Sequence, residues 1–429
     1  MKAAALVGLL FWSSLSSACA GHEDGKKWTK EELAELEANW GQEWSFSGIG
    51  SFAHLDHTKC LLDPAVQYDI AIVGAPFDTA VAYRPGKHSL FQAFIGCRYP
   101  LVFFMSTIIT HIHTGARFGP RAIRHASGRQ VAFRAFNPRA NISPYQNWAK
   151  IIDCGDIPIT PFDNNIAREQ MTEASKLLGN RRGVSVLKPK PMLMTLGGDH
   201  RLTLPALRAL NEIYGRPVRV LYFDIQPTWI PGTQRPTHPT GGITHFTHGS
   251  MFWMANQEGL LSNATHEKSV HVGLRTHLIG NDFNDNDDDT NQGWVRFSAD
   301  DNDEIGTTGI IDGIMGTLET KDPVYLSMDI DVLDPACAPG TGTPKPGGWA
   351  TRELIRILRG IEGLNFVGAD FVEVSPTYQG NEEETALAAA QVVYEVLSLM
   401  VKRGMNGIVK EGRGKDELQE LWLLVKCMQ

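Results

Sequence analysis

The chain contains six short apolar runs, each with a glycine, proline or aspartate within or at the end of the run. Within each run nearly every position is apolar, and polar residues do not alternate with apolar ones. Strands that are buried on both faces of a parallel sheet show this pattern, whereas strands with one solvated face alternate. We therefore expect six internal strands, at residues 69–76, 191–199, 218–224, 269–276, 324–331 and 364–374.

Segments with helical periodicity lie between these runs. Strands that alternate with helices predict an α/β fold, here a three-layer α/β/α sandwich with a mainly parallel central sheet. No internal repeat or linker interrupts the pattern, so we expect one domain over residues 67–404, followed by a C-terminal tail at 405–429. The predicted helices cover residues 170–178, 204–214, 351–361 and 385–402, with a further helical stretch at 29–39.

The N-terminus has the three parts of a secretory signal peptide. Lys2 precedes the apolar run Ala3–Trp12, and Ala18–Ala20 supplies small residues for cleavage. The run is too short for an ordinary membrane span, so we expect no membrane segment in the mature form. The sequence predicts a signal peptide at 1–20, a secreted or secretory-pathway protein, and a polar N-terminal extension at 21–66.

Charge and cysteine content restrict the function further. The chain has 40 basic and 48 acidic residues, a net charge of −8, which argues against a nucleic-acid binder and agrees with a cationic substrate. Five cysteines remain after Cys19 leaves with the signal peptide, and their spacing indicates no particular pairing. In a secreted chain, Asn141 and Asn263 begin glycosylation sequons.

Carboxylates gather at the ends of three predicted strands. His200 follows one strand within Gly197–His200, Asp224 ends the next, and Asp329 and Asp331 end a third. Parallel sheets bind ligands at the carboxyl ends of their strands, so these side chains are expected to converge. Carboxylates at such short range repel one another, and a bound cation relieves the repulsion. One histidine with several aspartates suits Mn²⁺ or a similar metal.

The motifs around these residues resemble the ureohydrolases, the family of arginase and agmatinase. The most specific is the segment 327–348, SMDIDVLDPACAPGTGTPKPGG, and the forms HGSMF at 248–252 and FVEVSP at 371–376 are more similar to agmatinase than to arginase. The resemblance runs in order from about Asp69 to Leu399. Further matching motifs lie at 74–78, 83–86, 116–120 and 197–200.

The resemblance implies a centre with two Mn²⁺ ions, which activates water to attack a guanidinium carbon and release urea. It also implies the roles of single residues: His248 shuttles a proton and Glu373 pairs with the substrate guanidinium. Ureohydrolases form trimers or hexamers, so a homo-oligomer is expected. The residues at family ligand positions are His200, Asp224, Asp329 and Asp331, with Asp224 and Asp329 in the bridging places.

Two departures from the family pattern stand out. Where the family has Asp-Ala-His-x-Asp-Thr-Trp, this chain has DIQPTW at 224–229, so Gln226 takes the histidine place and the second aspartate is missing. We expect weaker or incomplete metal occupancy, and we interpret His238 and His245 downstream as loop residues. Residues 87–115 form an atypical apolar insertion, for which translated non-coding sequence is one hypothesis.

Three functions remain open. The first is hydrolysis of agmatine to putrescine and urea, and the second is the same reaction on 4-guanidinobutyrate or another linear guanidine. The third is a pseudoenzyme that keeps the fold as a binding or regulatory protein. The acidic segment 281–291 lacks the central glycine and terminal glutamate of an EF-hand, so we expect a solvated loop there.

Overall fold

The computed structural model describes residues 29–31, 34, 50–79, 115–185, 188–228, 246–261, 268–278 and 281–410, with side chains as far as Met405. The chain divides into two units, Met1–Gly48 and Ile49–Gln429. In the first unit, Lys30, Glu31 and Ala34 are helical, inside the helical stretch expected there. The signal peptide, nearly all of the insertion, His238, His245, Asn263 and the tail after residue 410 lie outside the described residues.

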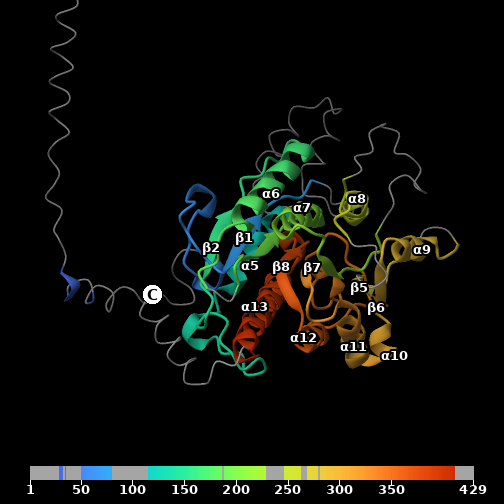
Figure 1. The fold of residues 1–429 in the computed structure, drawn as a ribbon. Coiled ribbons are helices and arrows are strands. Elements are labelled where there is room, and N and C mark those ends of the chain that lie inside the picture. Colours follow the sequence, from blue (N-terminus) through green and yellow to red (C-terminus); the bar gives the residue numbers. More distant parts are fainter. Residues whose placement is uncertain are drawn as a thin grey trace, which may run out of the picture. The chain divides into compact units, whose positions relative to one another are not determined.

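The second unit is built on one eight-stranded sheet in which every pair of neighbouring strands is parallel (Figure 1). This confirms the predicted α/β class. All six predicted strands are present. In spatial order the strands are β2 (Ile151–Asp156), β1 (Ile70–Ala75), β3 (Met192–Gly197), β8 (Asn365–Val372), β7 (Pro323–Asp329), β4 (Arg219–Phe223), β5 (Ser269–Leu274) and β6 (Trp294–Ser298).

The two strands that the pattern did not predict, β2 and β6, are the two edges of the sheet. Four of the five residues of β6 are only half-buried, and β2 ends in the exposed Asp156. An edge strand contacts solvent along one side and carries polar residues within its run. The continuous apolar signature therefore marks only the interior strands.

Helices cover both faces of the sheet (Figure 1). One layer contains α6 (Asn164–Gly179), α7 (Thr203–Tyr214) and α8 (Met251–Gln257), and the other contains α5 (Gly119–Ser127), α11 (Gly306–Leu318), α12 (Thr351–Gly360) and α13 (Glu384–Lys410). α9 (Asn284–Asn291) and α10 (Asp301–Glu304) pack beside β6. Short 3₁₀ turns are η1 (Phe52–His54), η2 (Cys60–Leu62), η3 (Ala116–Phe118), η4 (Ala132–Arg134), η5 (His200–Leu202), η6 (Ile330–Val332) and η7 (Pro376–Tyr378).

The acidic segment 281–291 is helical over α9, so the prediction of a loop was wrong. Asp289 of this helix is fully buried, and its carboxylate lies 3.7 Å from both Arg296 and His271. The segment therefore buries one carboxylate near two basic side chains, although its composition alone favours a solvated loop.

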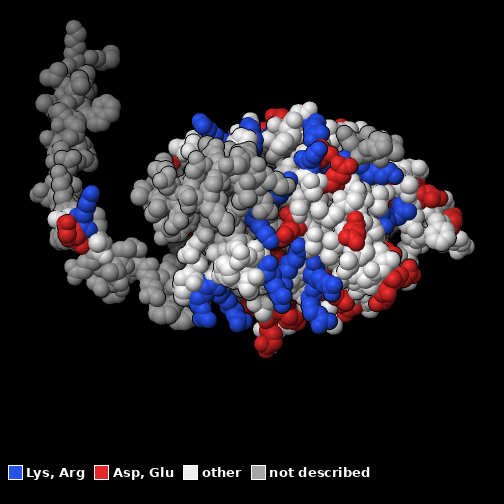
Figure 2. All heavy atoms as spheres, turned by 60° about the horizontal axis from the view of Figure 1, so that its bottom comes forward, with Lys and Arg blue, Asp and Glu red and all other residues white. Residues whose placement is uncertain are grey.

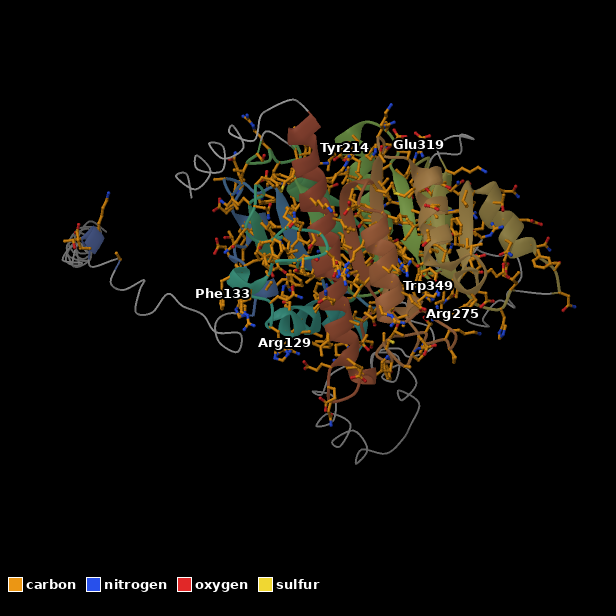
Figure 3. All side chains as sticks on the ribbon, turned by 90° about the horizontal axis from the view of Figure 1, so that it is seen from below. Arg129, Phe133, Tyr214, Arg275, Glu319 and Trp349 are labelled. Carbon is orange, nitrogen blue, oxygen red and sulfur yellow. A yellow bond between two sulfur atoms is a disulfide. The ribbon has the colours of Figure 1, made fainter. Side chains whose placement is uncertain are left out.

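Helix α13 lies between α5 and α12 in its layer. Its stretch Glu384–Met405 is long and apolar enough to cross a membrane, but 78% of the most apolar window is buried inside the domain. It packs against α5, α12 and β8, so its hydrophobicity is explained by the core. Figure 3 looks onto this layer, with Arg275 and Trp349 near the carboxyl ends of the strands and Tyr214 and Glu319 near the amino ends.

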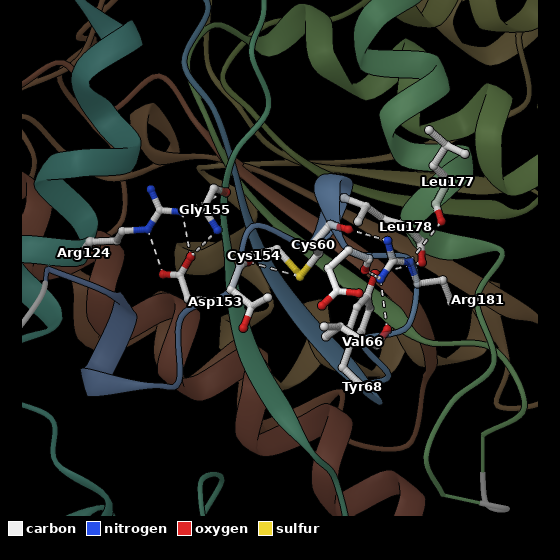
Figure 4. The surroundings of a disulfide bond; sticks show 12 residues. Cys60, Val66, Tyr68, Arg124, Asp153, Cys154, Gly155, Leu177, Leu178 and Arg181 are labelled. Atoms are coloured by element: carbon white, nitrogen blue, oxygen red, sulfur yellow. Dashed lines mark hydrogen bonds and ion pairs between the residues drawn. A yellow bond between two sulfur atoms is a disulfide. The ribbon is translucent and has the colours of Figure 1, made fainter. Parts of the chain in front are cut away.

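A disulfide joins Cys60 of η2 to Cys154 of β2 and so ties residues before the sheet to its edge strand (Figure 4). The neighbouring Asp153 is fully buried, accepts from Arg124 Nε at 2.8 Å and from Phe52 N–H at 2.8 Å, and anchors the same region. Cysteine spacing alone did not indicate this pairing. Cys337 is a free thiol.

On the face shown in Figure 2, basic and acidic side chains are interspersed.

Candidate metal centre and active site

The fold brings the carboxyl ends of four adjacent strands, β3, β8, β7 and β4, to one edge of the sheet. His200 follows β3, Glu373 follows β8, Asp329 ends β7 and Asp224 follows β4. All four side chains are buried. The chain inserts β7 and β8 between β3 and β4, so residues far apart in sequence meet at the place where parallel sheets bind ligands.

His200, Asp224 and Asp329 form a compact group of metal-binding atoms. His200 Nδ1 lies 3.0 Å from Asp329 Oδ2 and 3.1 Å from Asp224 Oδ2. Adjacent ligands of an octahedral cation with bonds of about 2.1 Å are separated by about 3 Å, so the spacing suits one such ion. Among the described residues, only these three histidine, cysteine or carboxylate side chains offer atoms all within 4.8 Å of one another.

A buried hydrogen-bond network selects the histidine nitrogen that faces this group. Asp370 Oδ1 accepts from Ser327 Oγ at 2.8 Å, and Oδ2 accepts from Tyr325 OH and Thr203 Oγ1, both at 2.8 Å. Because the Ser327 hydroxyl gives its proton to Asp370, it accepts from His200 Nε2 at 2.7 Å. Nδ1 thereby faces the two carboxylates, and it can bind a cation once it has lost its proton, as metal-binding histidines require.

The electrostatics favour a cation at the same place. Burial, and then the negative charges of Asp224 and Glu373, raise the pKa of Asp329 well above its usual range. Burial, Asp329 and Asp224 do the same for the pKa of Asp331. For His200, burial alone lowers the pKa, but the hydrogen bond and charge of Asp224 outweigh it and raise the pKa. A divalent cation stabilises all these groups in their deprotonated forms.

The second half of the expected metal centre is less complete. Asp331 Oδ2 accepts from Thr343 Oγ1 at 2.8 Å, while its buried Oδ1 has no hydrogen-bond partner in the described part of the chain. Gln226 donates its backbone N–H to Asp224 Oδ1 at 2.7 Å, and its own Oε1 is also buried without a partner there. The described residues thus fit one cation, and the unpartnered oxygens that they offer to a second are one carboxylate oxygen of Asp331 and the amide oxygen of Gln226.

Glu373 lies beside the group in a strained backbone conformation. Its φ of 62° is in the left-handed region, which costs a non-glycine residue about 1–2 kcal/mol and is often found at functional sites. Its Oε1 accepts from the His200 N–H at 3.0 Å. Burial, and then the charge of Asp199, raise the pKa of Glu373 well above its usual range, and a cationic group that pairs with this side chain stabilises its ionised form.

Asp224, Asp329 and Glu373 line one pocket at the edge of the sheet, and His200 contacts its wall through the two aspartates. His248, half-buried in the turn before α8, lies on its wall with the neighbouring Gly249. The pocket thus brings the predicted proton shuttle together with two metal-ligand candidates and with Glu373. Asp331 is not part of the lining, but it accepts a hydrogen bond from the lining residue Thr343. The full lining is Tyr222, Asp224, Gln226, Pro227, His248, Gly249, Asp329, Thr343 and Glu373.

The sequence interpretation missed the residues that orient the ligands. Tyr222 donates to the Asp224 carboxylate, Ser327 contacts His200, and both precede a ligand by two positions. Residues two apart on a strand share a face, so polar residues at these positions were a usable signal. Arg275 also fixes the loop after β7, because its guanidinium donates to the carbonyls of Asp331, Val332 and Leu333 at 2.6–3.1 Å.

Comparison with known proteins identifies the family of the chain. The model of the arginase family matches residues 101–398. The chain is 40% identical over 368 residues to the Schizosaccharomyces pombe protein named "Putative agmatinase 3", covering 83% of this chain and 81% of the relative. It is 32% identical over 367 residues to the agmatinase of Chromobacterium violaceum, covering 85% and 92%.

Among solved structures, the proclavaminate amidino hydrolase of Streptomyces clavuligerus matches with a TM-score of 0.64 and 30% identity. The match covers 84% of this chain and all of that one. The chain belongs to the arginase family.

Proposed function

We propose that this protein is a manganese-dependent amidinohydrolase that cleaves a linear guanidino compound, agmatine first, to putrescine and urea. The observation that carries the proposal is the convergence of His200, Asp224 and Asp329 beside Glu373 and His248. The relatives named agmatinase support the choice of agmatine over other linear guanidines.

We assign each side chain of the site one role in the proposed reaction. His200, Asp224 and Asp329 would hold a divalent cation, and a bound cation would supply a water molecule of lowered pKa as a nucleophile near neutral pH. Glu373 pairs with the guanidinium group and orients its carbon, since a buried carboxylate binds a guanidinium through charge-assisted hydrogen bonds. His248 on the pocket wall moves a proton to the leaving amine.

Occupancy by a second ion is expected to be weak in this chain. An amide oxygen at Gln226 is neutral and binds a divalent transition metal less strongly than an imidazole does. The missing aspartate also removes one negative charge. We assign no step of the reaction to a second ion. The pseudoenzyme alternative depends on the same two changes in segment 224–229.

Urea release from agmatine by the purified chain with added Mn²⁺ tests the proposal. We expect turnover with agmatine, slower turnover with 4-guanidinobutyrate, and loss of both in the Asp329→Asn variant. Asp334→Asn is the matched control, because Asp334 is an aspartate of the same motif that bonds backbone N–H groups rather than joining the metal group. Absence of urea from every guanidine tested would support the pseudoenzyme alternative.

We also propose that the protein follows the secretory route. The disulfide between Cys60 and Cys154 supports this, because disulfides persist in oxidising compartments and are rare in the cytosol. The signal-like N-terminus supports it independently. Fractionation of cells expressing the full chain, with N-terminal sequencing of the product, should give secretory-pathway protein that begins after Ala20; uncleaved chain in the cytosol would contradict the proposal.

A further inference from the structure

Asn141 ends a tight turn on the surface of the domain. The turn covers residues 138–141 and is closed by Asn137 and Ile142, whose backbones exchange hydrogen bonds of 2.7 and 3.3 Å. The Asn141 side chain is exposed, while Ile142 is 6% exposed and packs into the core. The asparagine therefore faces solvent from a fixed position.

The side chain of Asn137 connects the turn to helix α13 by hydrogen bonds. Its amide nitrogen donates to Glu395 Oε2 at 3.1 Å and to Ser398 Oγ at 3.3 Å in α13. Its amide oxygen accepts from the backbone N–H groups of Arg139 and Ala140, which shapes the turn itself. A bulky group attached at Asn141 can extend into solvent without disturbing these contacts.

The turn is also distant from the catalytic pocket along α13. That helix begins at Glu384, on the carboxyl side of the sheet, and Asn137 contacts it at Glu395. At a rise of 1.5 Å per residue, this contact is roughly 16 Å further along the helix. Trp148, later in the same segment, contacts the carbonyl of Val401, so the segment runs away from the pocket.

Asn141 is the acceptor residue of the tripeptide Asn141-Ile142-Ser143, which has the form of an N-glycosylation sequon. The Ser143 hydroxyl is buried and makes no hydrogen bond within the described structure, so the fold gives it no evident structural role. The disulfide between Cys60 and Cys154 provides an independent indication that the chain folds where glycosylation takes place.

We propose that Asn141 carries an N-linked oligosaccharide in the mature protein. The transfer forms a bond between Asn141 Nδ2 and the anomeric carbon of the sugar. The donor is a lipid-linked oligosaccharide, in which that carbon is bonded to a lipid pyrophosphate. This bond breaks, the lipid pyrophosphate leaves, and the amide nitrogen loses one proton. The oligosaccharide covers the surface beside α13 and leaves the pocket open.

A structural role for Asn141 must be separated from a role as acceptor. Its φ of 57° lies in the left-handed region, which asparagine tolerates better than most residues, so the turn geometry alone favours asparagine there. The variant Ser143→Ala keeps Asn141 and the turn but destroys the sequon. Asn141→Gln removes the acceptor directly, and Asn263→Gln removes the other sequon of the chain.

The test expresses the full chain with its own N-terminus in a eukaryotic host and treats the product with a peptide N-glycosidase in ¹⁸O-labelled water. This enzyme converts a glycosylated asparagine to aspartate and labels it. We expect labelled aspartate at position 141 in the wild type and in Asn263→Gln, and none in Ser143→Ala or Asn141→Gln. An unmodified Asn141 in the wild-type chain, from whichever compartment it is recovered, would overturn the proposal.

Discussion

Removing the Ser327 hydroxyl is expected to weaken metal binding although Ser327 does not touch the metal group. In the Ser327→Ala variant, His200 Nε2 loses its acceptor at 2.7 Å and Asp370 Oδ1 loses its donor at 2.8 Å. Ser327 is fully buried, so water does not readily replace the hydroxyl. The imidazole then loses the contact that fixes its tautomer and its orientation toward Asp224 and Asp329.

The magnitude follows from the cost of an unsatisfied buried N–H group. That cost is about 1–3 kcal/mol, and about 1.4 kcal/mol corresponds to a tenfold change in affinity. Loss of an orienting partner of a metal-binding histidine weakens metal affinity by about 10- to 100-fold, in the same range. We therefore expect the Kd for Mn²⁺ to rise by about 10- to 100-fold.

Titration calorimetry with Mn²⁺ measures this effect directly, and Tyr325→Phe serves as the control. Tyr325 donates to Asp370 Oδ2 but makes no contact with His200, so its loss should change the Kd by less than about threefold. Thermal melts of the metal-free variants check that both fold. An unchanged Kd in Ser327→Ala, or an equal loss in Tyr325→Phe, would refute the specific role proposed for the Ser327 hydroxyl.

Three further predictions concern the pocket, its protons and the disulfide. Glu373→Gln should lower kcat/KM for agmatine by roughly 30- to 1000-fold, because breaking a buried charge pair costs about 2–4 kcal/mol, and it should change the Mn²⁺ affinity little. A kcat/KM equal to that of the wild type would contradict the role assigned to Glu373. Because burial raises the pKa of Asp329 and Asp331, Mn²⁺ must displace protons, so affinity should rise with pH through these raised pKa values. Calorimetry in two buffers of different ionisation enthalpy should detect the released protons, and identical heats would exclude them. Replacing Cys60 and Cys154 together by Ser should lower the free energy of unfolding by about 3–5 kcal/mol in urea denaturation, whereas Cys337→Ser should leave it unchanged. An unchanged urea midpoint in the double variant would show that the disulfide does not stabilise the fold.

The sequence predicted the interior of the sheet well and its edges poorly, for one physical reason. Residues 324–329 of β7 are buried on both faces, and burial of this kind requires the continuous apolar run that predicts a strand. β6 has the short run WVRFS, whose Arg296 and Ser298 are compatible with a strand only because that side of the sheet is open. No local pattern distinguishes such a strand from a loop.

The candidate site divides along similar lines. His200, Asp224 and Asp329 could be found because each directly follows or ends an interior strand, and parallel strands bring these positions together. The pairing of Cys60 with Cys154 could not be found, since it depends on how the segment before β1 folds back against the edge strand. The left-handed backbone at Glu373 likewise emerges only when the strand order is known.

Parallel measurement of bound manganese and urea release on one sample of purified wild-type chain tests the central claim most directly. The geometry of His200, Asp224 and Asp329 predicts at least one Mn²⁺ per chain, with urea formed from agmatine in proportion to the metal bound. A chain that binds Mn²⁺ at these residues, as judged by loss of binding in Asp329→Asn, yet releases no urea would contradict the proposed activity. A chain that binds no Mn²⁺ would contradict the metal centre itself.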